Sequence, residues 1–170
     1  VAGIFLKNIV LQRLIFENMR KPNNIRKSIS KEITFDFDLF EEDQLAKALW
    51  MLSENVSAEL KLKGMAARTI TLKLKRSNFQ LSTLSHTTSQ QLKMAEDLYQ
   101  ISYALLLKKT HLSPFRLIGL SASKLLVDNE QGMVEKSLDN TLLKKHKTEL
   151  VMDELRSKFG KKIISKGRSF

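Results

Sequence analysis

Cysteine is absent from this sequence, and its absence removes several classes of protein at once. Without a thiol there is no disulfide framework, no thiolate nucleophile and no cysteine-based zinc site. Histidine is scarce as well: His86, His111 and His146 are widely spaced along the chain, so a histidine metal site is not expected. Thiol and metal chemistry therefore find no support in the sequence.

Long apolar runs are also missing. The longest aliphatic run, residues 104–107, is far shorter than the roughly 20 residues that span a bilayer. Charged residues interrupt the apolar N-terminal stretch, so no signal peptide is expected. With 42% apolar residues, the 170-residue chain can still pack one domain with appendages. We expect a cytoplasmic protein that does not enter a membrane.

Positive charge is present in excess, with 29 Lys and Arg against 18 Asp and Glu and a net charge of +11. The excess is uneven: residues 1–27 carry +5, residues 28–86 are neutral, residues 87–123 carry +2 and residues 124–170 carry +4. A strongly basic chain favours a polyanionic partner, such as nucleic acid. Solubility alone is a simpler explanation of such charge, and composition does not separate the two.

Two segments, residues 28–37 and 66–75, alternate between apolar and polar residues, which predicts strands with one buried face. The predicted buried residues are Ile33, Phe35 and Phe37 in the first segment and Ile70, Leu72 and Leu74 in the second. The opposite faces carry Ser30, Glu32, Thr34 and Asp36 in the first segment and Thr69, Thr71, Lys73 and Lys75 in the second. Rows of hydroxyl and ammonium groups suit phosphate oxygens, so these faces point to nucleic acid.

The order of elements predicts an α+β fold of β-α-β-β-α-β type, with two helices on one face of a four-stranded sheet. The expected strands are residues 28–37, 66–75, 79–85 and 115–121. The other sheet face is left uncovered in this arrangement. That is consistent with a binding surface and also with domains that bind nothing there.

Capping residues predict where the helices begin and end. Asp38 is the expected N-cap of the first helix, and Gly64 is its expected end. Thr87, Thr88 and Ser89 are candidate caps for the second helix, which should end before Pro114.

Four regions follow from these patterns. Residues 1–24 form an apolar and basic segment of unclear role, residues 25–123 the domain, residues 124–146 a polar linker, and residues 147–170 a short C-terminal helix with a basic tail.

Four stretches in order resemble the little-finger domain of the Y-family translesion DNA polymerases, the DNA polymerase IV or ImpB-MucB-SamB group. They are Arg-Lys-Ser-Ile-Ser-Lys-Glu-Ile-Thr-Phe at residues 26–35, then residues 64–79, 83–87 and 114–121. Residues 153–168 are loosely similar to the tail that follows this domain in some bacterial members. Each stretch is short, and the specificity of the resemblance comes from their order.

The resemblance implies that the chain binds the backbone of primer-template DNA without sequence preference, as part of an error-prone, lesion-bypassing polymerase in DNA repair and damage tolerance. The residues that it implies for DNA binding are Arg26, Lys27, Ser28, Lys31, Thr69, Thr71, Lys73, Lys75, Thr83, Ser85, Thr87 and Arg116. It implies no catalytic residue and no metal site in this chain. In the family the carboxylates that hold Mg²⁺, the cofactor of the full-length polymerase, lie upstream of this domain.

The chain departs from the family pattern in three places. Leu84 stands where the family usually has Arg, which would put an apolar side chain on the presumed DNA face and remove one phosphate contact. Leu117 occupies a position that is cationic in some relatives. Residues 1–24 do not resemble the family's thumb domain.

Two other functions deserve comparison. An RNA-recognition module shares the β-α-β-β-α-β order but needs exposed aromatic residues on its central strands. Here Gln80 and Ser82 are predicted to face outward, and Phe79 is predicted to face inward with Leu81, which argues against it.

The second is a protein-interaction module that tethers a polymerase to the sliding clamp through a short peptide with a leading Gln. Residues 131–134 have the expected location for such a peptide, and residues 12–16 have the better chemistry. Tethering is therefore the alternative function.

Overall fold

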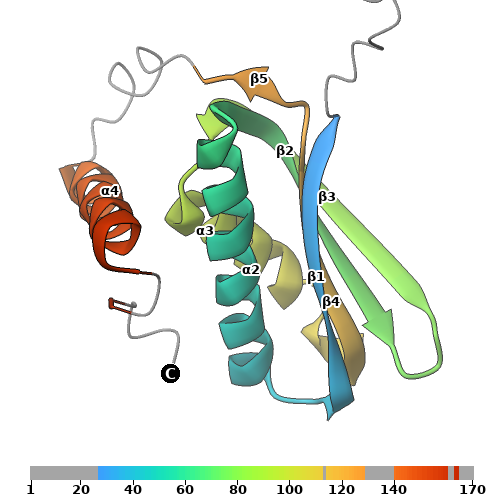
Figure 1. The fold of residues 1–170 in the computed structure, drawn as a ribbon. Helices are drawn as coiled ribbons and strands as arrows, with labels where there is room; N and C mark the ends of the chain where they lie inside the picture. Colours follow the sequence, from blue (N-terminus) through green and yellow to red (C-terminus); the bar gives the residue numbers. More distant parts are fainter. Residues whose placement is uncertain (1–26, 113, 129–139, 161–162, 165–170) are drawn as a thin grey trace, which may run out of the picture.

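The computed structural model describes residues 27–112, 114–128, 140–160 and 163–164. Its elements, in chain order, are β1 (Ser28–Leu39), α2 (Glu42–Leu62), β2 (Met65–Arg76), β3 (Leu81–Leu92), α3 (Ala95–Leu107), the 3₁₀ turn η1 (Thr110–Leu112), β4 (Phe115–Ser123), β5 (Leu126–Val127) and α4 (Asn140–Phe159). The predicted α+β fold with β-α-β-β-α-β order is confirmed (Figure 1). The C-terminal helix begins earlier than expected, at Asn140.

The sheet has the spatial order β1-β4-β2-β3, and all neighbouring strands are antiparallel. The two-residue strand β5 adds to one end of β2, where Met65 pairs with Val127. β1 and β4 are far apart in the sequence yet lie side by side, with Ser28 opposite Ser123. The sheet therefore forms only when both ends of the domain have been brought together.

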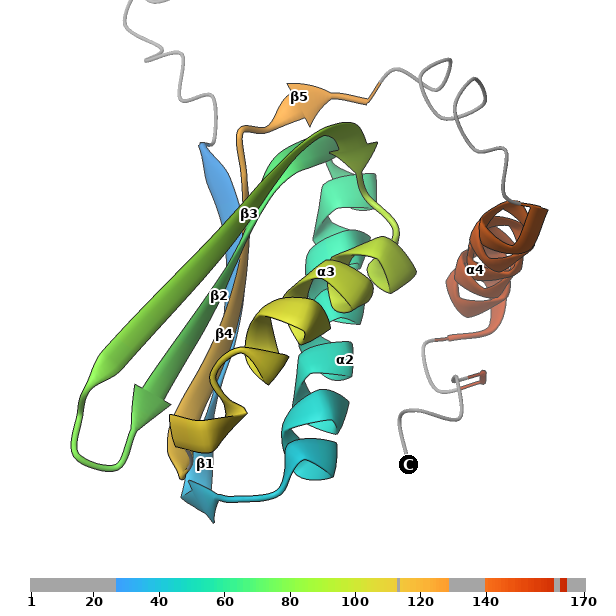
Figure 2. The same ribbon diagram turned by 180° about the vertical axis from the view of Figure 1, so that it is seen from behind.

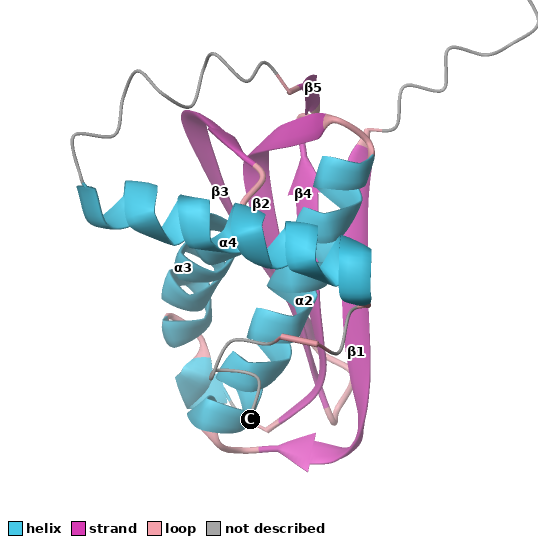
Figure 3. Ribbon diagram, turned by 60° about the vertical axis from the view of Figure 1, so that its left-hand side comes forward, coloured by secondary structure: helices cyan, strands magenta, loops and turns pink. Residues whose placement is uncertain are grey.

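The molecule has three layers. α2 and α3 cover one face of the sheet, and α4 lies outside these two helices, on the side away from the sheet (Figures 1 and 2). In Figure 3 α4 crosses in front of α2 and α3, with the strands behind them. The opposite face of the sheet is not covered by any described element.

The core fills the space between the sheet and the two inner helices. The alternation in β2 holds as predicted, because Ile70, Leu72 and Leu74 are all fully buried. The helix spacing in α2 brings Leu45, Leu49, Leu52, Val56 and Leu60 onto them, and α3 adds Leu98, Leu105 and Leu106. Burial of a leucine side chain contributes about 1.5–3 kcal/mol, so these two periodic patterns determine how the layers pack.

Two of the predicted helix caps are wrong. The N-cap position of α2 is Glu41, without a side-chain hydrogen bond, whereas the Asp38 carboxylate pairs with Arg116 at 2.9 Å. Residues 87–89 belong to β3, which runs on to Leu92, so they do not begin α3. The predicted end of α2 is confirmed: Gly64 follows the helix with φ +59°, a conformation that glycine adopts without strain.

α3 receives its cap from another helix. Its own N-cap residue, Met94, offers no side-chain hydrogen bond. Instead the Glu149 carboxylate of α4 accepts the backbone N–H groups of Ala95 at 2.8 Å and Glu96 at 3.3 Å. A carboxylate at this position satisfies two N–H groups that have no partner within the helix, and it complements the helix dipole.

Charged contacts hold α4 against the inner helices. Glu149 is almost completely buried and also pairs with Lys61 of α2 at 2.5 Å, while Arg156 pairs with Glu54 at 3.0 Å. Burial raises the pKa of Glu149, but Lys61 and the two amide donors outweigh it, so the net pKa lies below the usual 4.5. Glu149 is therefore held as a carboxylate at neutral pH.

One apolar residue of β1 departs from the predicted alternation. Phe37 was expected to be buried with Ile33 and Phe35, but its side chain is 73% exposed. The pairing of β1 with β4 shifts register between Thr34 and Leu39, and such an irregularity turns the following side chains away from their expected face.

Candidate nucleic-acid interface

The uncovered face of the sheet is built from residues that lie opposite one another on four strands. Because partners in an antiparallel sheet project to the same side, the strand register gives the composition of this surface directly. Its rows, read from β1 through β4 and β2 to β3, are Ser28-Ser123-Thr69-Thr87, Ser30-Ser121-Thr71-Ser85, Glu32-Gly119-Lys73-Thr83 and Thr34-Leu117-Lys75-Leu81. We call these four rows the open face.

The first two rows consist entirely of serine and threonine. Neighbouring hydroxyls are hydrogen bonded across β2 and β3: Thr69 with Thr87 and Thr71 with Ser85, each at 2.8 Å between oxygens. A hydroxyl has one proton to donate, so within each pair one proton is used and the other remains available. Each pair can thus donate outward to an acceptor such as a phosphate oxygen.

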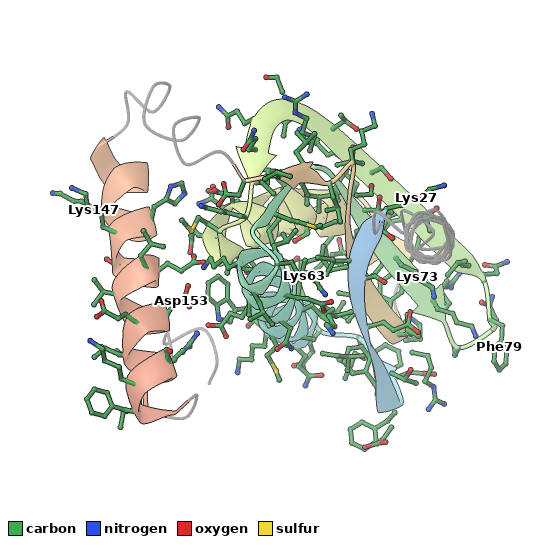
Figure 4. The ribbon with its side chains drawn as sticks, turned by 45° about the horizontal axis from the view of Figure 1, so that its top comes forward. Lys27, Lys63, Lys73, Phe79, Lys147 and Asp153 are labelled. Carbon is green, nitrogen blue, oxygen red and sulfur yellow. The ribbon has the colours of Figure 1, made fainter. Side chains whose placement is uncertain are left out.

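Cations lie on both sides of these two rows, in the direction along the strands. Lys73 and Lys75 occupy the third and fourth rows, where the Lys75 Nζ lies 4.7 Å from the centre of the Phe79 ring. At the other end, Lys27 precedes Ser28 and Lys124 follows Ser123, and both are exposed. Figure 4 shows Lys27 and Lys73 on the sheet side of the molecule and Lys147 on α4, on the far side. The two hydroxyl rows therefore lie between two groups of lysines.

Eight of the residues assigned to DNA binding from the sequence lie together in the open face. They are Ser28, Thr69, Thr71, Lys73, Lys75, Thr83, Ser85 and Thr87. Lys27 adjoins them, and Arg26 lies outside the described residues.

Two assigned residues are not brought to this surface. Lys31 lies between Ile29 and Ile33 on the helix side, and its Nζ pairs with Glu59 of α2 at 2.8 Å. Arg116 lies where the pairing of β4 is irregular; its guanidinium pairs with Asp38 and donates to the Asp36 carbonyl at 2.8 Å. Both cations already have partners within the domain.

The DNA-binding residues assigned from the sequence left out three serines of the open face and the neighbouring Lys124, although Ser30 had been predicted to lie on the polar face of its strand. Ser30 had the right parity in β1, and Ser121 and Ser123 alternate in β4 with the buried Leu120 and Ala122. The alternation in β4 was the signal that could have found the last two.

The expectation that Leu84 lies on the DNA face is wrong. Leu84 is opposite Leu72 in the register, so it points to the helix side and packs against the core. The leucine at this position therefore leaves the open face polar.

The inward orientation predicted for Phe79 and Leu81 is also wrong. Phe79 lies in the β2–β3 turn with φ +65° and is 77% exposed, and Leu81 is opposite Lys75 in the open face. Ser82, predicted to face outward, is opposite Leu74 on the helix side. The RNA-recognition module is still disfavoured, because the four rows contain no aromatic residue for stacking bases.

The described residues form neither a metal centre nor a membrane-spanning helix. Within these ranges no three His, Asp or Glu side chains gather as they would around a metal ion, so the carboxylates present do not fit a two-metal centre. No helix in this part of the chain is long and apolar enough to cross a membrane. Both candidate clamp peptides, residues 12–16 and 131–134, lie outside the described residues.

The architecture and the open face define an α+β domain with a split β-α-β topology and a polar sheet surface. Residues 26–138 match the impB/mucB/samB family C-terminal domain. The chain belongs to this family, and its domain is the little-finger domain of the Y-family DNA polymerases.

Two curated relatives are DNA polymerase IV proteins. The chain is 37% identical over 156 residues to DNA polymerase IV 1 of Mesorhizobium japonicum, covering 91% of this chain and 35% of that protein. It is 32% identical to DNA polymerase IV of Caulobacter vibrioides, covering 87% of this chain and 36% of that protein. The chain thus spans about a third of the length of these relatives.

Among solved structures, the insertion ternary complex of Dbh DNA polymerase is similar in fold. Its TM-score is 0.53 at 12% sequence identity, and the likeness covers 73% of this chain and 36% of that chain.

Proposed function

We propose that this chain binds primer-template DNA through the open face, contacting the phosphate backbone without reading base sequence. In this role it serves as the little finger of an error-prone, lesion-bypassing DNA polymerase. Its membership of the family and its similarity to proteins named DNA polymerase IV support this function. A cytoplasmic location, where bacterial DNA lies, remains our prediction.

One structural observation carries the proposal: two complete rows of hydroxyl residues lie on an uncovered sheet face, flanked along the strands by the exposed Lys27 and Lys124 on one side and the half-buried Lys73 and Lys75 on the other. Hydroxyl and ammonium donors spaced along a surface suit a chain of phosphates, and they carry no pattern that would distinguish one base from another. Positioning of a duplex, rather than recognition of a sequence, is the activity that such donors support.

The salt dependence of binding tests the proposal. In a fluorescence anisotropy titration of a labelled primer-template, contact with about four to six phosphates should give a slope of log K against log salt near −4 to −5. Two duplexes of unrelated sequence should bind equally well. A slope near zero, or a marked preference for one sequence, would contradict the proposal.

Matched lysine variants locate the contact. Lys75→Ala, in the fourth row of the open face, should lower the magnitude of the salt slope by about one. Lys147→Ala removes the same charge from the outer helix α4 and should leave the slope unchanged. If both variants have the same effect, the charge of the whole chain and not the open face is responsible.

Tethering to the sliding clamp gives a different result in the same experiment. A chain whose main partner is a protein would bind DNA weakly at all salt concentrations, and Lys75→Ala would change nothing. The geometric support for DNA binding comes from the open face, and the candidate tethering peptides lie outside the described residues.

A further inference from the structure

Glu32 is the one acidic residue in the four rows of the open face. Its Oε2 lies 2.9 Å from the Nζ of Lys73, although the two residues belong to β1 and β2, which are separated by β4. An acidic residue at this position is unexpected on a surface that would otherwise attract phosphates.

Gly119 makes this contact across β4 possible. It lies between the two residues in the third row, and a Cβ added to it would lie 3.2 Å from the Glu32 Cβ and 3.5 Å from the Lys73 Cβ. Opposed Cβ atoms in an antiparallel pair are usually about 4.5–5.5 Å apart. The missing side chain therefore leaves a path over β4 through which the carboxylate and the ammonium group meet.

The Glu32 carboxylate offers Lys73 the same kind of acceptor as a phosphate: an anionic oxygen that accepts a charge-assisted hydrogen bond. The pair is accessible, since 39% of the Lys73 side chain and 53% of the Glu32 side chain are exposed. An incoming phosphate can therefore reach the ammonium group and replace the carboxylate. Among the described residues no carboxylate is paired with Lys75, whose ammonium group lies over the Phe79 ring.

We propose that Glu32 is an internal competitor of the DNA phosphate for Lys73. It pairs with Lys73 in the free protein and releases it when DNA binds, so that one carboxylate is exchanged for one phosphate. This inference rests on the proposed function of the open face. Its consequence is that Glu32 weakens DNA binding, both by occupying Lys73 and by placing a negative charge beside the arriving phosphate, and keeps the complex readily reversible.

Glu32→Gln tests the inference, because it removes the charge and keeps the size of the side chain. The variant should bind a labelled primer-template about two- to fivefold more tightly at low salt, the range expected for an accessible ion pair. Its salt slope should steepen by up to about one, since Lys73 is then free to neutralise a phosphate. Glu32→Ser, which extends the hydroxyl row, should behave in the same way, and thermal unfolding checks that both variants fold.

Glu59→Gln is the matched control. It makes the same change in net charge, but Glu59 pairs with Lys31 on the helix side of the sheet, away from the open face. Its effect on DNA affinity should be smaller than that of Glu32→Gln. Equal effects would overturn the inference, because they would show a general electrostatic contribution of the whole chain.

A double-mutant cycle with Lys73→Ala shows whether Glu32 acts through Lys73. The gain from Glu32→Gln should shrink when Lys73 is absent. An undiminished gain in the Lys73→Ala background, or no gain in the wild-type background, would overturn the inference while leaving the proposed function in place. A wild-type chain that does not bind DNA at all would overturn the proposed function, and this inference with it.

Discussion

The direction of a single side chain decides whether a substitution at residue 84 affects DNA binding or stability. Leu84 lies on the helix side of β3, opposite Leu72, and its neighbour Ser85 lies in the open face. Leu84→Arg would therefore place a guanidinium group against the core. We expect a loss of about 1–3 kcal/mol in the free energy of unfolding and no tighter DNA binding.

Ser85→Arg is the natural comparison, because it adds the same charge one residue away, on the open face. It should keep the stability of the domain and tighten DNA binding at low salt. Urea unfolding measures the stability of both variants, and fluorescence anisotropy with labelled DNA measures their affinity. If Leu84→Arg tightens binding at unchanged stability and Ser85→Arg unfolds the domain, the assignment of faces in β3 is inverted.

For single residues, the sequence predicted well which face of the sheet each side chain of β2 occupies, and it predicted this poorly for residues near the strand ends. Period-two alternation assigned Ile70, Leu72 and Leu74 to the core because β2 pairs continuously with both neighbours over that stretch. It failed for Phe37, beyond the register shift of β1, and for Phe79, whose positive φ places it in a turn. Alternation says nothing about where the pairing breaks, so it could not show these two exceptions.

At the scale of elements, the contact between α4 and α3 makes a clear prediction about stability. Glu149→Gln removes the charge that caps α3 and pairs with Lys61. It should lower the free energy of unfolding by about 1–3 kcal/mol at neutral pH. Glu154→Gln, on an exposed part of the same helix, removes an ion pair with Lys158 and should cost little.

The effect of Glu149 should depend on pH in a definite direction. Its pKa is lower in the folded state than in the unfolded state, so its stabilising contribution is complete above the usual value of 4.5 and is lost as the pH falls below it. The difference between wild type and Glu149→Gln should therefore shrink in acid. Asp97 has the opposite effect on the pH dependence of stability. Burial raises its pKa by more than the neighbouring His146 lowers it, so ionisation of Asp97 at higher pH disfavours the folded state. A difference between the two proteins that stays constant down to pH 3 would contradict the assigned role of Glu149.

The four long strands and the two inner helices could be predicted, but β5, the start of α4 and the start of α3 could not. The run of hydroxyls at residues 87–89 looked like a helix start, and instead it extends β3 along β2. The true cap comes from Glu149, more than 50 residues further along the chain, and local sequence carries no sign of it. The candidate site was predicted in part: the hydroxyl and lysine residues of β2 were assigned correctly to the open face, whereas Leu84 of β3 was not. Lys31 and Arg116 pair with Glu59 and Asp38, which only the folded chain brings near.

At the scale of the whole molecule, we expect this chain to bind a primer-template without extending it. The described carboxylates are dispersed over caps and ion pairs and do not gather as a two-metal site. A primer-extension assay with Mg²⁺ and nucleotides should therefore show no product under conditions in which anisotropy shows binding. Metal-dependent extension that copurifies with the chain would show that the role of the domain has been misread.

The pairing of Ser28 with Ser123 has a mechanical consequence. The chain enters β1 and leaves β4 at the same end of the sheet, so tension between these two points pulls the strands apart sideways. Under such a force the hydrogen bonds between β1 and β4 break one after another. In the shear geometry, where the strands are pulled past each other, the same bonds would carry the force together. β1 is an edge strand, and β4 is its partner in the sheet. Under this force β1 should therefore separate from β4 first, while β2, β3 and β4 stay joined.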